Sequence, residues 1–223
     1  MLFDPSLITD PVPSKNNNHA EIIQRDNDGN IVALSYNYWN EDGFLGTSLE
    51  MDGMGFTSNS IVQIPTSPSL EALTNQISVM AWVNRNTGSV IPNGNSPNVA
   101  IFAHEFPSLF FGYNNAKYQF QFETDTDAVV CEAGDYNPGE WEHVAGTYDG
   151  NTVRLYVNGQ EIHSAAITGD LKINTEAPAN NMFTVSGFYD NRALPVMPYG
   201  NSSGITDELD GLMDKFKLYN TAL

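Results

Sequence analysis

The chain has 223 residues, of which 41% are apolar and 16% are charged. This length corresponds to one large domain or two small ones, and the apolar content is sufficient for a packed core. Twenty-seven acidic residues against nine basic ones give a formal net charge of −18, which repels nucleic-acid phosphates and anionic lipids and excludes both as expected partners.

Residues 1–30 differ in composition from the rest of the chain. Pro5, Pro11 and Pro13 punctuate this segment, and proline fixes the backbone and removes an N–H donor. The sequence therefore predicts an extended N-terminal arm over residues 1–30, followed by one domain over residues 31–223. An arm of this kind is ordered only where something holds it. We expect a neighbouring subunit or a sheet edge of the same chain to do so.

The sequence shows no targeting or membrane-spanning segment. The first residues, Met1–Pro5, have neither the basic region nor the apolar region of a secretory signal. No apolar run approaches the roughly 20 residues that span a bilayer. The single cysteine, Cys131, excludes an internal disulfide and a cysteine-based zinc cluster. We expect a virion or another extracellular assembly reached without a signal, or else the cytoplasm.

Strand and turn patterns dominate from residue 31 onward. Ser67–Leu73, with Pro68 at a favoured first position, predicts one short helical turn. Ile77–Val83 is a run rich in β-forming residues. Tyr118–Glu123 alternates apolar and polar residues, as a half-buried strand does.

The clearest pattern lies between residues 141 and 164. Trp141–Tyr148 and Thr152–Val157 read as strands, and the dipeptide Asn158–Gly159 is a strong hairpin signal before Gln160–Ser164. These features predict a three-stranded antiparallel meander. Since helical periodicity is almost absent elsewhere, the sequence predicts an all-β fold made of two antiparallel sheets.

Four blocks of the sequence resemble laminin G-like domains, which belong to the concanavalin A-like lectin and glucanase superfamily. The blocks are the central signature Trp141–Gly150 with Val153–Gly159, the opening strands Ser48–Gly53 with Ile61–Pro65, the tryptophan strand Ile77–Val83, and the closing strand Leu209–Leu223. The resemblance covers roughly residues 45–223 and implies a jelly-roll sandwich. It does not imply one function, because members bind glycans or proteins, cleave polysaccharides or serve as structural modules.

The closing strand contains a candidate metal ligand, Asp214. By period-two alternation it shares one side of the strand with three apolar residues, Leu212, Phe216 and Leu218, so we expect it to point inward to the core. A buried carboxylate is costly unless it is paired or bound to a metal. The resemblance implies a structural Ca²⁺ at Asp214 with oxygen atoms of Asp52 and Gly53. The alternative is a strand-end aspartate that solvent reaches or that backbone N–H groups cap.

One segment resembles a catalytic motif. Glu208, Asp210 and Asp214 resemble the carboxylates that family-16 glycoside hydrolases carry on one strand, about 5 Å apart where nucleophile and acid cooperate. The distal residue is here an aspartate rather than a glutamate, and the motif lies in the closing strand rather than mid-chain. We therefore expect a protein that is not an enzyme, with a family-16-like hydrolase as a less favoured alternative.

The histidines and the cysteine are expected to be structural. His104–Glu105 lacks the second histidine of a zinc-protease helix. His143 and His163 lie on strands expected to be neighbours, and we interpret them as packed residues. Cys131 follows two valines and reads as a small buried side chain.

Aromatic residues are the remaining candidates for ligand binding. Trp82 and Trp141 lie in strong strand patterns and are expected in the core. We predict ligand contacts from aromatic residues that the strand patterns do not assign to the core. They are Trp39 with its neighbours Tyr36 and Tyr38, and the loop residues Phe188, Tyr189 and Tyr199. Exposed aromatic faces beside polar side chains are typical of sugar sites. The alternative is that these rings cover a sandwich edge or a subunit interface.

These observations predict a non-catalytic, laminin G-like decoration subunit on the surface of a larger assembly, for example a phage or virus particle. In this interpretation the arm contacts protein partners, the chain is oligomeric or assembly-bound, and the sandwich adheres to a glycan or a host surface. The alternative is a stand-alone carbohydrate-binding lectin module.

Overall fold

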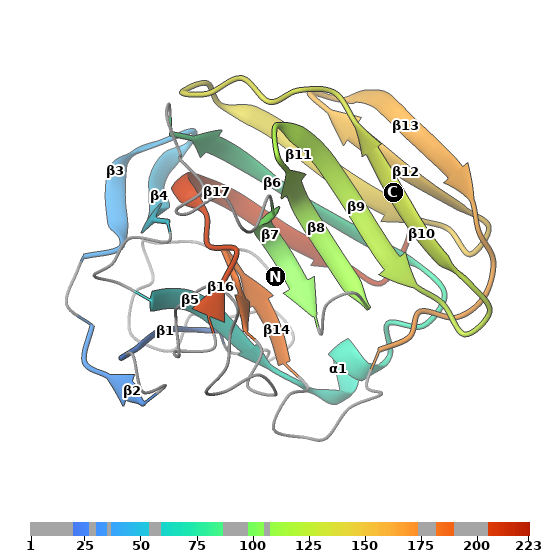
Figure 1. The fold of residues 1–223 in the computed structure, drawn as a ribbon, viewed down its shortest axis with the longest axis horizontal. Helices are drawn as coiled ribbons and strands as arrows, with labels where there is room; N and C mark the ends of the chain where they lie inside the picture. Colours follow the sequence, from blue (N-terminus) through green and yellow to red (C-terminus); the bar gives the residue numbers. More distant parts are fainter. Residues whose placement is uncertain are drawn as a thin grey trace.

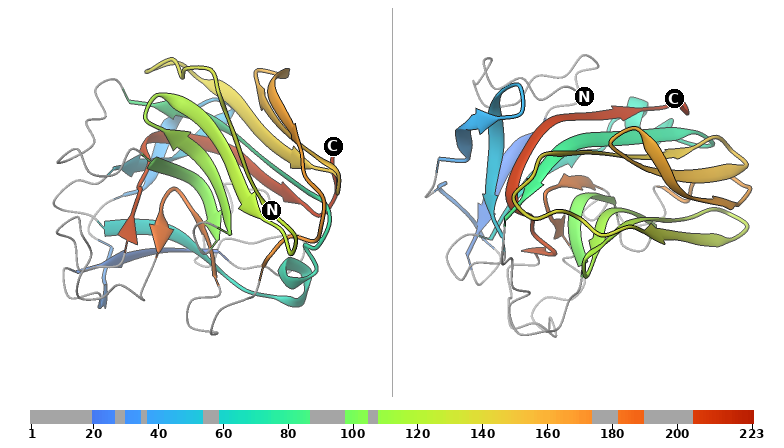
Figure 2. Two further views of the ribbon diagram at one scale, coloured as in Figure 1. Left: turned by 45° about the vertical axis from the view of Figure 1, so that its right-hand side comes forward. Right: turned by 90° about the horizontal axis from the view of Figure 1, so that it is seen from above.

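Two antiparallel sheets pack face to face in the computed structural model, which confirms the predicted all-β sandwich (Figures 1 and 2). The structure describes residues 20–26, 30–34, 37–53, 59–86, 98–104, 108–173, 182–189 and 205–223. Within these ranges, the side chains of Asp52, Asn59, Asn98, Tyr189, Ile205 and Thr206 are not described. All statements below concern the described part of the chain.

The larger sheet contains eight strands. In spatial order they are β10 (Ala128–Ala133), β9 (Lys117–Glu123), β8 (Leu109–Asn114), β7 (Asn98–His104), β14 (Met182–Val185), β5 (Asn59–Pro65), β1 (Glu21–Arg25) and β2 (Ile31–Val32). A short ribbon of β15 (Phe188–Tyr189) and β16 (Ile205–Thr206) is paired separately. Phe188 on this ribbon packs against Ala100, Ala103 and Phe110, which point away from the main core.

The smaller sheet contains seven strands. In spatial order they are β13 (Gln160–Ala166), β12 (Thr152–Val157), β11 (Glu142–Tyr148), β6 (Ile77–Arg85), β17 (Asp210–Tyr219), β4 (Gly46–Asp52) and β3 (Trp39–Gly43). The closing strand β17 lies between β4 and β6, so segments from both ends of the described chain meet in this sheet. Figure 1 shows the β3–β4 hairpin beside the end of β6, at the upper left.

One apolar core lies between the two sheets. Val79, Ala81 and Val83 point into it from β6, and Phe120 and Phe122 point into it from β9. Alternate residues of each strand supply the core because successive side chains of a strand point to opposite faces. Burial of this alternating set accounts for the strong strand patterns in the sequence.

The local elements predicted most strongly from the sequence are confirmed. β11, β12 and β13 form the expected meander, and Asn158 and Gly159 adopt φ angles of 50° and 79° in its turn. The helix α1 (Pro68–Glu71) begins after Ser67, whose side chain accepts a hydrogen bond from the N–H of Leu70. In the described part of the chain, no helix has the length and apolar character to cross a membrane.

Part of the predicted arm lies in the larger sheet. β1, within residues 1–30, pairs with β5 on one side and with β2 on the other. A sheet of the same chain therefore holds this part, which was one of the two alternatives. Residues 1–19 lie outside the described residues, so the arm itself and its boundary remain predictions.

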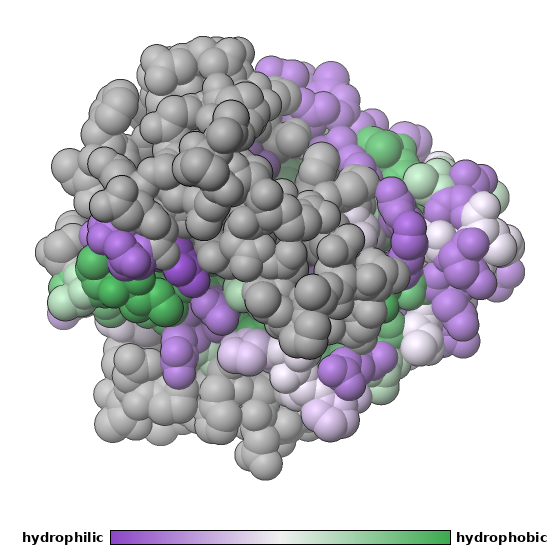
Figure 3. Space-filling model, turned by 60° about the horizontal axis from the view of Figure 1, so that its bottom comes forward, coloured by the Kyte–Doolittle hydropathy of each residue, from purple (hydrophilic) through white to green (hydrophobic). Residues whose placement is uncertain are grey.

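An exposed apolar patch lies at β2. Ile31 and Val32 of this strand and the following Leu34 are exposed. Figure 3 shows the patch at the left, at the position of β2 in Figure 1. We call these three residues the β2 patch.

A buried polar joint connects the two sheets. The carboxylate of Glu142 on β11 accepts hydrogen bonds from the Tyr118 hydroxyl on β9 and from the N–H and Nδ2 of Asn137. Beside it, the buried Arg85 guanidinium lies over the Tyr113 ring at 5.0 Å and over the Tyr136 ring at 4.4 Å. These contacts fix the two sheets against each other at that end of the sandwich.

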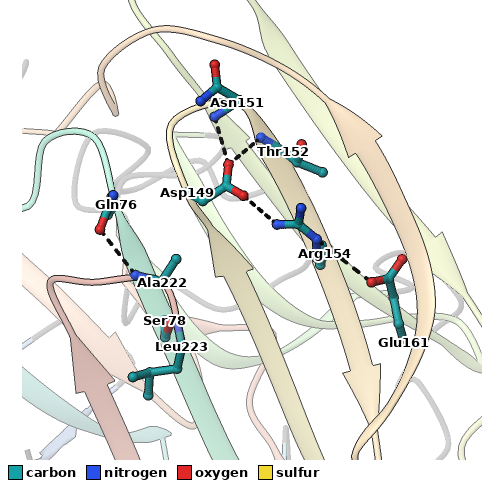
Figure 4. A network of polar contacts seen from close by, with 9 residues as sticks. All are labelled: Gln76, Ser78, Asp149, Asn151, Thr152, Arg154, Glu161, Ala222 and Leu223. Atoms are coloured by element: carbon teal, nitrogen blue, oxygen red, sulfur yellow. Dashed lines mark hydrogen bonds and ion pairs between the residues drawn. The ribbon is translucent and has the colours of Figure 1, made fainter.

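Further polar contacts hold strand ends of the seven-stranded sheet (Figure 4). The Asp149 carboxylate accepts from the N–H groups of Asn151 and Thr152 and pairs with Arg154 at 2.6 Å. The hydrogen bond from Arg154, together with these N–H groups, holds the pKa of Asp149 below its usual value. At the start of β6, the Ser78 hydroxyl donates to the carbonyl of Thr221 at 2.7 Å and so ties down the end of the closing segment.

Candidate functional site

An aromatic cluster lies on the outer face of the seven-stranded sheet, the face turned away from the core. On β6, Ala81 and Val83 are buried in the core, so the alternate residue Trp82 points outward and is half-buried. Trp82 lies opposite His143 of β11 on one side and opposite Asp214 of β17 on the other. The outer face thus carries an indole flanked by an imidazole and a carboxylate.

Four rings form this cluster, which we call the aromatic platform: Phe44, Trp82, Trp141 and His143. The Phe44 ring stacks on Trp82 with centroids 3.5 Å apart and an interplanar angle of 12°. The Trp141 ring lies 6.2 Å from Phe44, and His143 meets the edge of Trp82 at 5.3 Å. The prediction that Trp82 and Trp141 are core residues is wrong, because both are half-buried in a cluster outside the core.

Phe44 and Leu45 form the turn between β3 and β4, which we call the tip. Gly46 has a φ of 96°, and a Cβ atom on Gly43 would lie 2.1 Å from the carbonyl oxygen of Gly46. Only glycine fits this tight turn at both ends without strain. Phe44 is 38% exposed and Leu45 is 63% exposed. The tip therefore presents two apolar side chains to solvent, while its Phe44 ring stacks on Trp82.

The Asp214 carboxylate is held under the tip and is only 2% exposed. Its Oδ2 accepts a hydrogen bond of 2.9 Å from the N–H of Leu45. Its Oδ1 accepts one of 2.7 Å from the N–H of Lys215 and lies 3.3 Å from the Lys215 ammonium. These donors compensate the burial of the charge.

Asp214 is buried, but the prediction that it points into the core is wrong. The pairing of β17 with β6 is irregular after Asp214, and Lys215 has a φ of 50°. This bulge interrupts the alternation, so Met213 and Phe216 both lie in the core. Asp214 lies opposite Trp82 and faces the tip instead.

A buried hydroxyl lies in the same row of the sheet. Leu49 of β4 is paired with Met213, and both are core residues, so the preceding Ser48 points outward at the level of Asp214. Ser48 is 1% exposed, and its Oγ has no hydrogen-bond partner among the described residues. Ser48, Asp214, Trp82 and His143 thus form one row across four strands.

His143 supplies a neutral ring at the far end of this row. Burial, and next the positive charge of Lys217, lowers the pKa of His143 below its ordinary value. The backbone N–H of His143 donates to the side-chain oxygen of Asn158 at 2.9 Å, which fixes this end of the strand. A neutral imidazole can both donate and accept hydrogen bonds toward a ligand.

The strand pairing separates the residues predicted to bind calcium along β17 and β4. Asp52 lies opposite Asp210, four positions before Asp214 on β17, and the N–H of Gly53 donates to the carbonyl of Leu209. Each oxygen of Asp214 accepts one N–H donor, and the pairing places Asp52 four residues along the strand from it. The calcium site stays a prediction and plays no part in the function proposed below.

The aromatic residues predicted to bind a ligand are scattered. Trp39 is half-buried and packs against the main core. Phe188 is 7% exposed and packs in its own small cluster, so its ring offers little surface to a ligand. The side chain of Tyr189 and the whole of Tyr199 lie outside the described residues. Ligand contacts from these residues stay predictions.

The three carboxylates of the hydrolase-like motif engage separate partners. Glu208 is buried and accepts from the N–H of Ser60 on the eight-stranded sheet at 2.9 Å. Asp210 accepts from the Asn86 side chain, and Asp214 is held by the tip. A retaining glycosidase needs two carboxylates facing one substrate bond. This arrangement does not favour the hydrolase alternative.

The other two candidate histidines and the cysteine pack or form hydrogen bonds within the described part of the fold. The His104 ring is buried 4.4 Å from the Phe183 ring, and the His163 Nδ1 accepts from the N–H of Glu132 at 3.0 Å. Cys131 is fully buried, and burial raises the pKa of its thiol to about 11. No group of three or more histidine, cysteine, aspartate or glutamate residues is placed to hold a metal ion within the described ranges.

Sequence reasoning missed Phe44, which completes the platform. Its signal is local: two apolar residues between Gly43 and Gly46 at the expected end of a strand. A tight glycine turn usually carries polar residues, so an apolar pair in that place indicates a contact with another surface.

Comparison with known proteins identifies the family. A family model described as the concanavalin A-like lectin/glucanases superfamily matches residues 56–223. Among curated proteins, pappalysin-1 of Mus musculus is 36% identical over 58 residues, which are 25% of this chain and 4% of the mouse protein. The chain therefore spans only a small part of that relative.

Solved structures share the fold at low sequence identity. Domain 4 of AbnA, a GH43 extracellular arabinanase from Geobacillus stearothermophilus solved with arabinotriose, has a TM-score of 0.55 and 18% identity, covering 94% of this chain and 86% of that one. The binding domain of Paraclostridial Mosquitocidal Protein 1 has a TM-score of 0.64 and 10% identity, covering 96% and 46%. The binding domain of botulinum neurotoxin DC, solved with rat synaptotagmin II, has a TM-score of 0.59 and 13% identity. This match covers 94% of this chain and 45% of that one.

The match covers most of the chain, including the whole meander and the closing strand β17. The sandwich observed in the structure is the fold that the sequence resemblance implied. The chain belongs to the concanavalin A-like lectin/glucanase superfamily and has a laminin G-like, lectin-like fold.

Proposed function

We propose that the protein is a non-catalytic carbohydrate-binding domain that holds a glycan on the aromatic platform. The observation that carries this proposal is the partly exposed ring cluster of Phe44, Trp82, Trp141 and His143 on the outer face of the seven-stranded sheet. The apolar face of a sugar ring packs on an aromatic face, and neighbouring polar groups bind its hydroxyls. The half-buried His143 supplies a polar group of this kind beside Trp82.

Among the described residues, the outer face of the eight-stranded sheet offers less aromatic surface for this purpose. At the centre of its outer face, Phe110 is fully buried together with Ala100, Ala103 and Phe188. The neighbouring Thr184 and Gln119 are also buried. The fold relatives support a binding function, since one is an arabinanase domain solved with arabinotriose and another is a toxin binding domain solved with rat synaptotagmin II.

A printed array of plant, bacterial and animal oligosaccharides, including arabinotriose, tests this function. We expect the full chain to bind a defined subset, and Trp141→Ala to weaken that binding at least tenfold, because the substitution removes ring surface without entering the core. Val130→Ala is the control, since Val130 is exposed on β10 of the other sheet. Binding to no glycan, or equal binding by Trp141→Ala, would contradict the proposal.

A second candidate function is that of a subunit of a larger assembly, for example a surface subunit of a phage or virus particle. The β2 patch favours it: β2 is the last strand of the eight-stranded sheet as described, and Ile31 and Val32 on it are exposed. An open edge strand presents N–H and C=O groups to another strand. The occupant we propose is β2 of a second copy, because edge strands pair with themselves about a two-fold axis.

Light scattering on the full chain tests this second candidate. We expect a dimer for the wild type and a monomer for Ile31→Lys. Val130→Lys, which places the same charge at an exposed position on β10, serves as the matched control and should associate as the wild type does. A monomeric wild type at all concentrations would contradict it.

A further inference from the structure

We infer that the tip, Phe44 and Leu45, occupies a sugar-binding position on Trp82, and that a glycan binds there by displacing the tip. This inference rests on the function proposed above and adds a specific position and its cover. Phe44 lies on Trp82 in the geometry a sugar ring adopts on an indole: the planes are nearly parallel, at 12°, and the centroids are 3.5 Å apart. The tip therefore covers the best stacking surface of the platform.

The polar part of the tip also matches a sugar. The N–H of Leu45 donates a hydrogen bond of 2.9 Å to Oδ2 of Asp214, which lies opposite Trp82 in the next strand. A hydroxyl of a sugar stacked on Trp82 is a donor of the same kind. The tip thus provides one apolar face and one hydrogen-bond donor, which are the two features by which proteins recognise a sugar ring.

The buried Ser48 hydroxyl in the same row lacks a hydrogen-bond partner among the described residues. Ser48 is level with Asp214 on β4 and is 1% exposed. Buried polar groups are nearly always paired, so an unpaired one needs an explanation. A sugar hydroxyl that replaces the tip would bind Asp214 and reach toward Ser48. The Ser48 hydroxyl would then gain a hydrogen-bond partner, and this gain would favour the open state in which the tip is displaced.

The tip is attached weakly enough to move. Gly43 and Gly46 flank it, and glycine permits the backbone rotations that a hinge needs. β3 is the end strand of its sheet, and its pairing with β4 is irregular between Asn40 and Gly43. Among the described residues, the tip is held by the Phe44 ring contacts with Trp82 and Trp141 and by the hydrogen bond to Asp214, and its Leu45 side chain is 63% exposed.

A covered site has a measurable cost in affinity. If the open state holds about a tenth of the molecules, the apparent dissociation constant is about ten times the intrinsic one. Phe44→Ala removes the stacked ring but keeps the N–H of Leu45 and both glycines. We therefore expect Phe44→Ala to bind the best oligosaccharide of the array about tenfold more tightly than the wild type. Trp82→Ala should abolish that binding.

Amide hydrogen exchange at Leu45 gives a second readout, which does not depend on affinity. A ligand that displaces the tip breaks the hydrogen bond from Leu45 to Asp214, so the Leu45 amide should exchange faster when the oligosaccharide is bound. A ligand that binds on top of a closed tip would slow this exchange. The Glu132 amide, bonded to His163 between β10 and β13 rather than to the tip, is the internal control.

The outcomes separate the two proposals. Binding to no glycan by either the wild type or Phe44→Ala overturns both the carbohydrate-binding function and this inference. If Phe44→Ala weakens glycan binding, or if the bound glycan slows exchange at the Leu45 amide, the tip is part of the binding surface and not a displaceable cover. Either result overturns this inference and leaves the carbohydrate-binding function standing. Binding that survives Trp82→Ala places the glycan elsewhere and also overturns the inference alone. Folding of each variant is checked by its urea unfolding transition.

Discussion

The hydroxyl of Tyr118 donates a hydrogen bond to the carboxylate of Glu142, and this single contact joins a strand of one sheet to a strand of the other. Both side chains are buried, and Asn137 supplies the other two donors to the same carboxylate. A charge at the junction of two sheets is therefore surrounded by hydrogen bonds, and its removal leaves several donors without an acceptor.

Glu142→Ala is expected to lower the free energy of unfolding by about 3 kcal/mol, since buried hydrogen bonds to a charged group contribute about 1.5–3 kcal/mol each and the effects do not add fully. Urea unfolding measures the change. Tyr118→Phe, which removes only one of the donors, should cost less. Glu140→Ala, at an exposed neighbouring position, is the control and should change stability by no more than about 0.5 kcal/mol. Equal stability of Glu142→Ala and Glu140→Ala would refute the role of the joint.

Stability should decrease at high pH because of Tyr113 and Tyr118. Burial raises the pKa of both hydroxyls, and for Tyr118 the hydrogen bond to Glu142 raises it further. Below pH 10 both states keep these protons, so no dependence is expected. Above pH 10 the unfolded chain loses them and the folded chain keeps them, so the free energy of unfolding falls by about 1.4 kcal/mol per pH unit for each tyrosine.

Urea unfolding between pH 9 and pH 11.5 gives this slope. In Tyr118→Phe the slope above pH 10 should be shallower than in the wild type by about 1.4 kcal/mol per pH unit. Glu140→Ala, at an exposed position without a hydroxyl, is the control and should keep the wild-type slope. Identical slopes in all three proteins would show that these hydroxyls ionise freely in the folded state.

Cys131 should not react with thiol reagents in the folded protein. The side chain is fully buried in the core, and its pKa is raised to about 11, so both access and thiolate are lacking at pH 8. We expect labelling by an aromatic disulfide reagent to follow the unfolding equilibrium as urea is added. Rapid labelling of the whole population in the absence of urea would contradict the observed burial.

Substitution of Asp214 should loosen the tip and destabilise the sheet. Asp214→Ala leaves the N–H groups of Leu45 and Lys215 without their acceptor, and we expect a loss of about 1–3 kcal/mol in the free energy of unfolding. Asp214→Asn keeps one acceptor oxygen and should lie between this variant and the wild type. Exchange at the Leu45 amide should become faster in Asp214→Ala. An unchanged exchange rate would show that this hydrogen bond does not hold the tip.

The parts of the fold that were predictable depend on local chemistry. Asn158 and Gly159 adopt the left-handed conformations that their turn requires, and the strands on either side alternate cleanly. Ser67 and Pro68 start α1 because a serine caps the helix and proline suits its first turn. Such signals need no knowledge of distant residues.

The orientation of Trp82 was not predictable in the same way. β6 has apolar residues on both faces, with Val83 toward the core and Trp82 away from it, so alternation alone does not identify the outer face. The bulge after Asp214 is equally hidden, because the sequence of β17 shows a regular alternation that the backbone does not follow. A one-residue irregularity changes which side chains share a face.

The site itself depends on contacts between distant segments. Leu45 and Asp214 are separated by 169 positions, and Glu208 reaches Ser60 across 148 positions. Reasoning from one segment at a time identified Asp214 as buried and in need of partners. It could not identify the tip as the partner, because that depends on the order of strands β3, β4 and β17 in the sheet.

The contact between β10 and β13 limits how copies of the chain can associate. The N–H of Glu132 on β10 donates to His163 on β13, so the end strands of the two sheets lie against each other and partly cover each other's edge on this side of the sandwich. A sheet open at both edges can recruit copies at each end and grow into a filament, whereas a sheet open at one edge stops after one addition. Pairing through β2 would therefore terminate at a closed dimer.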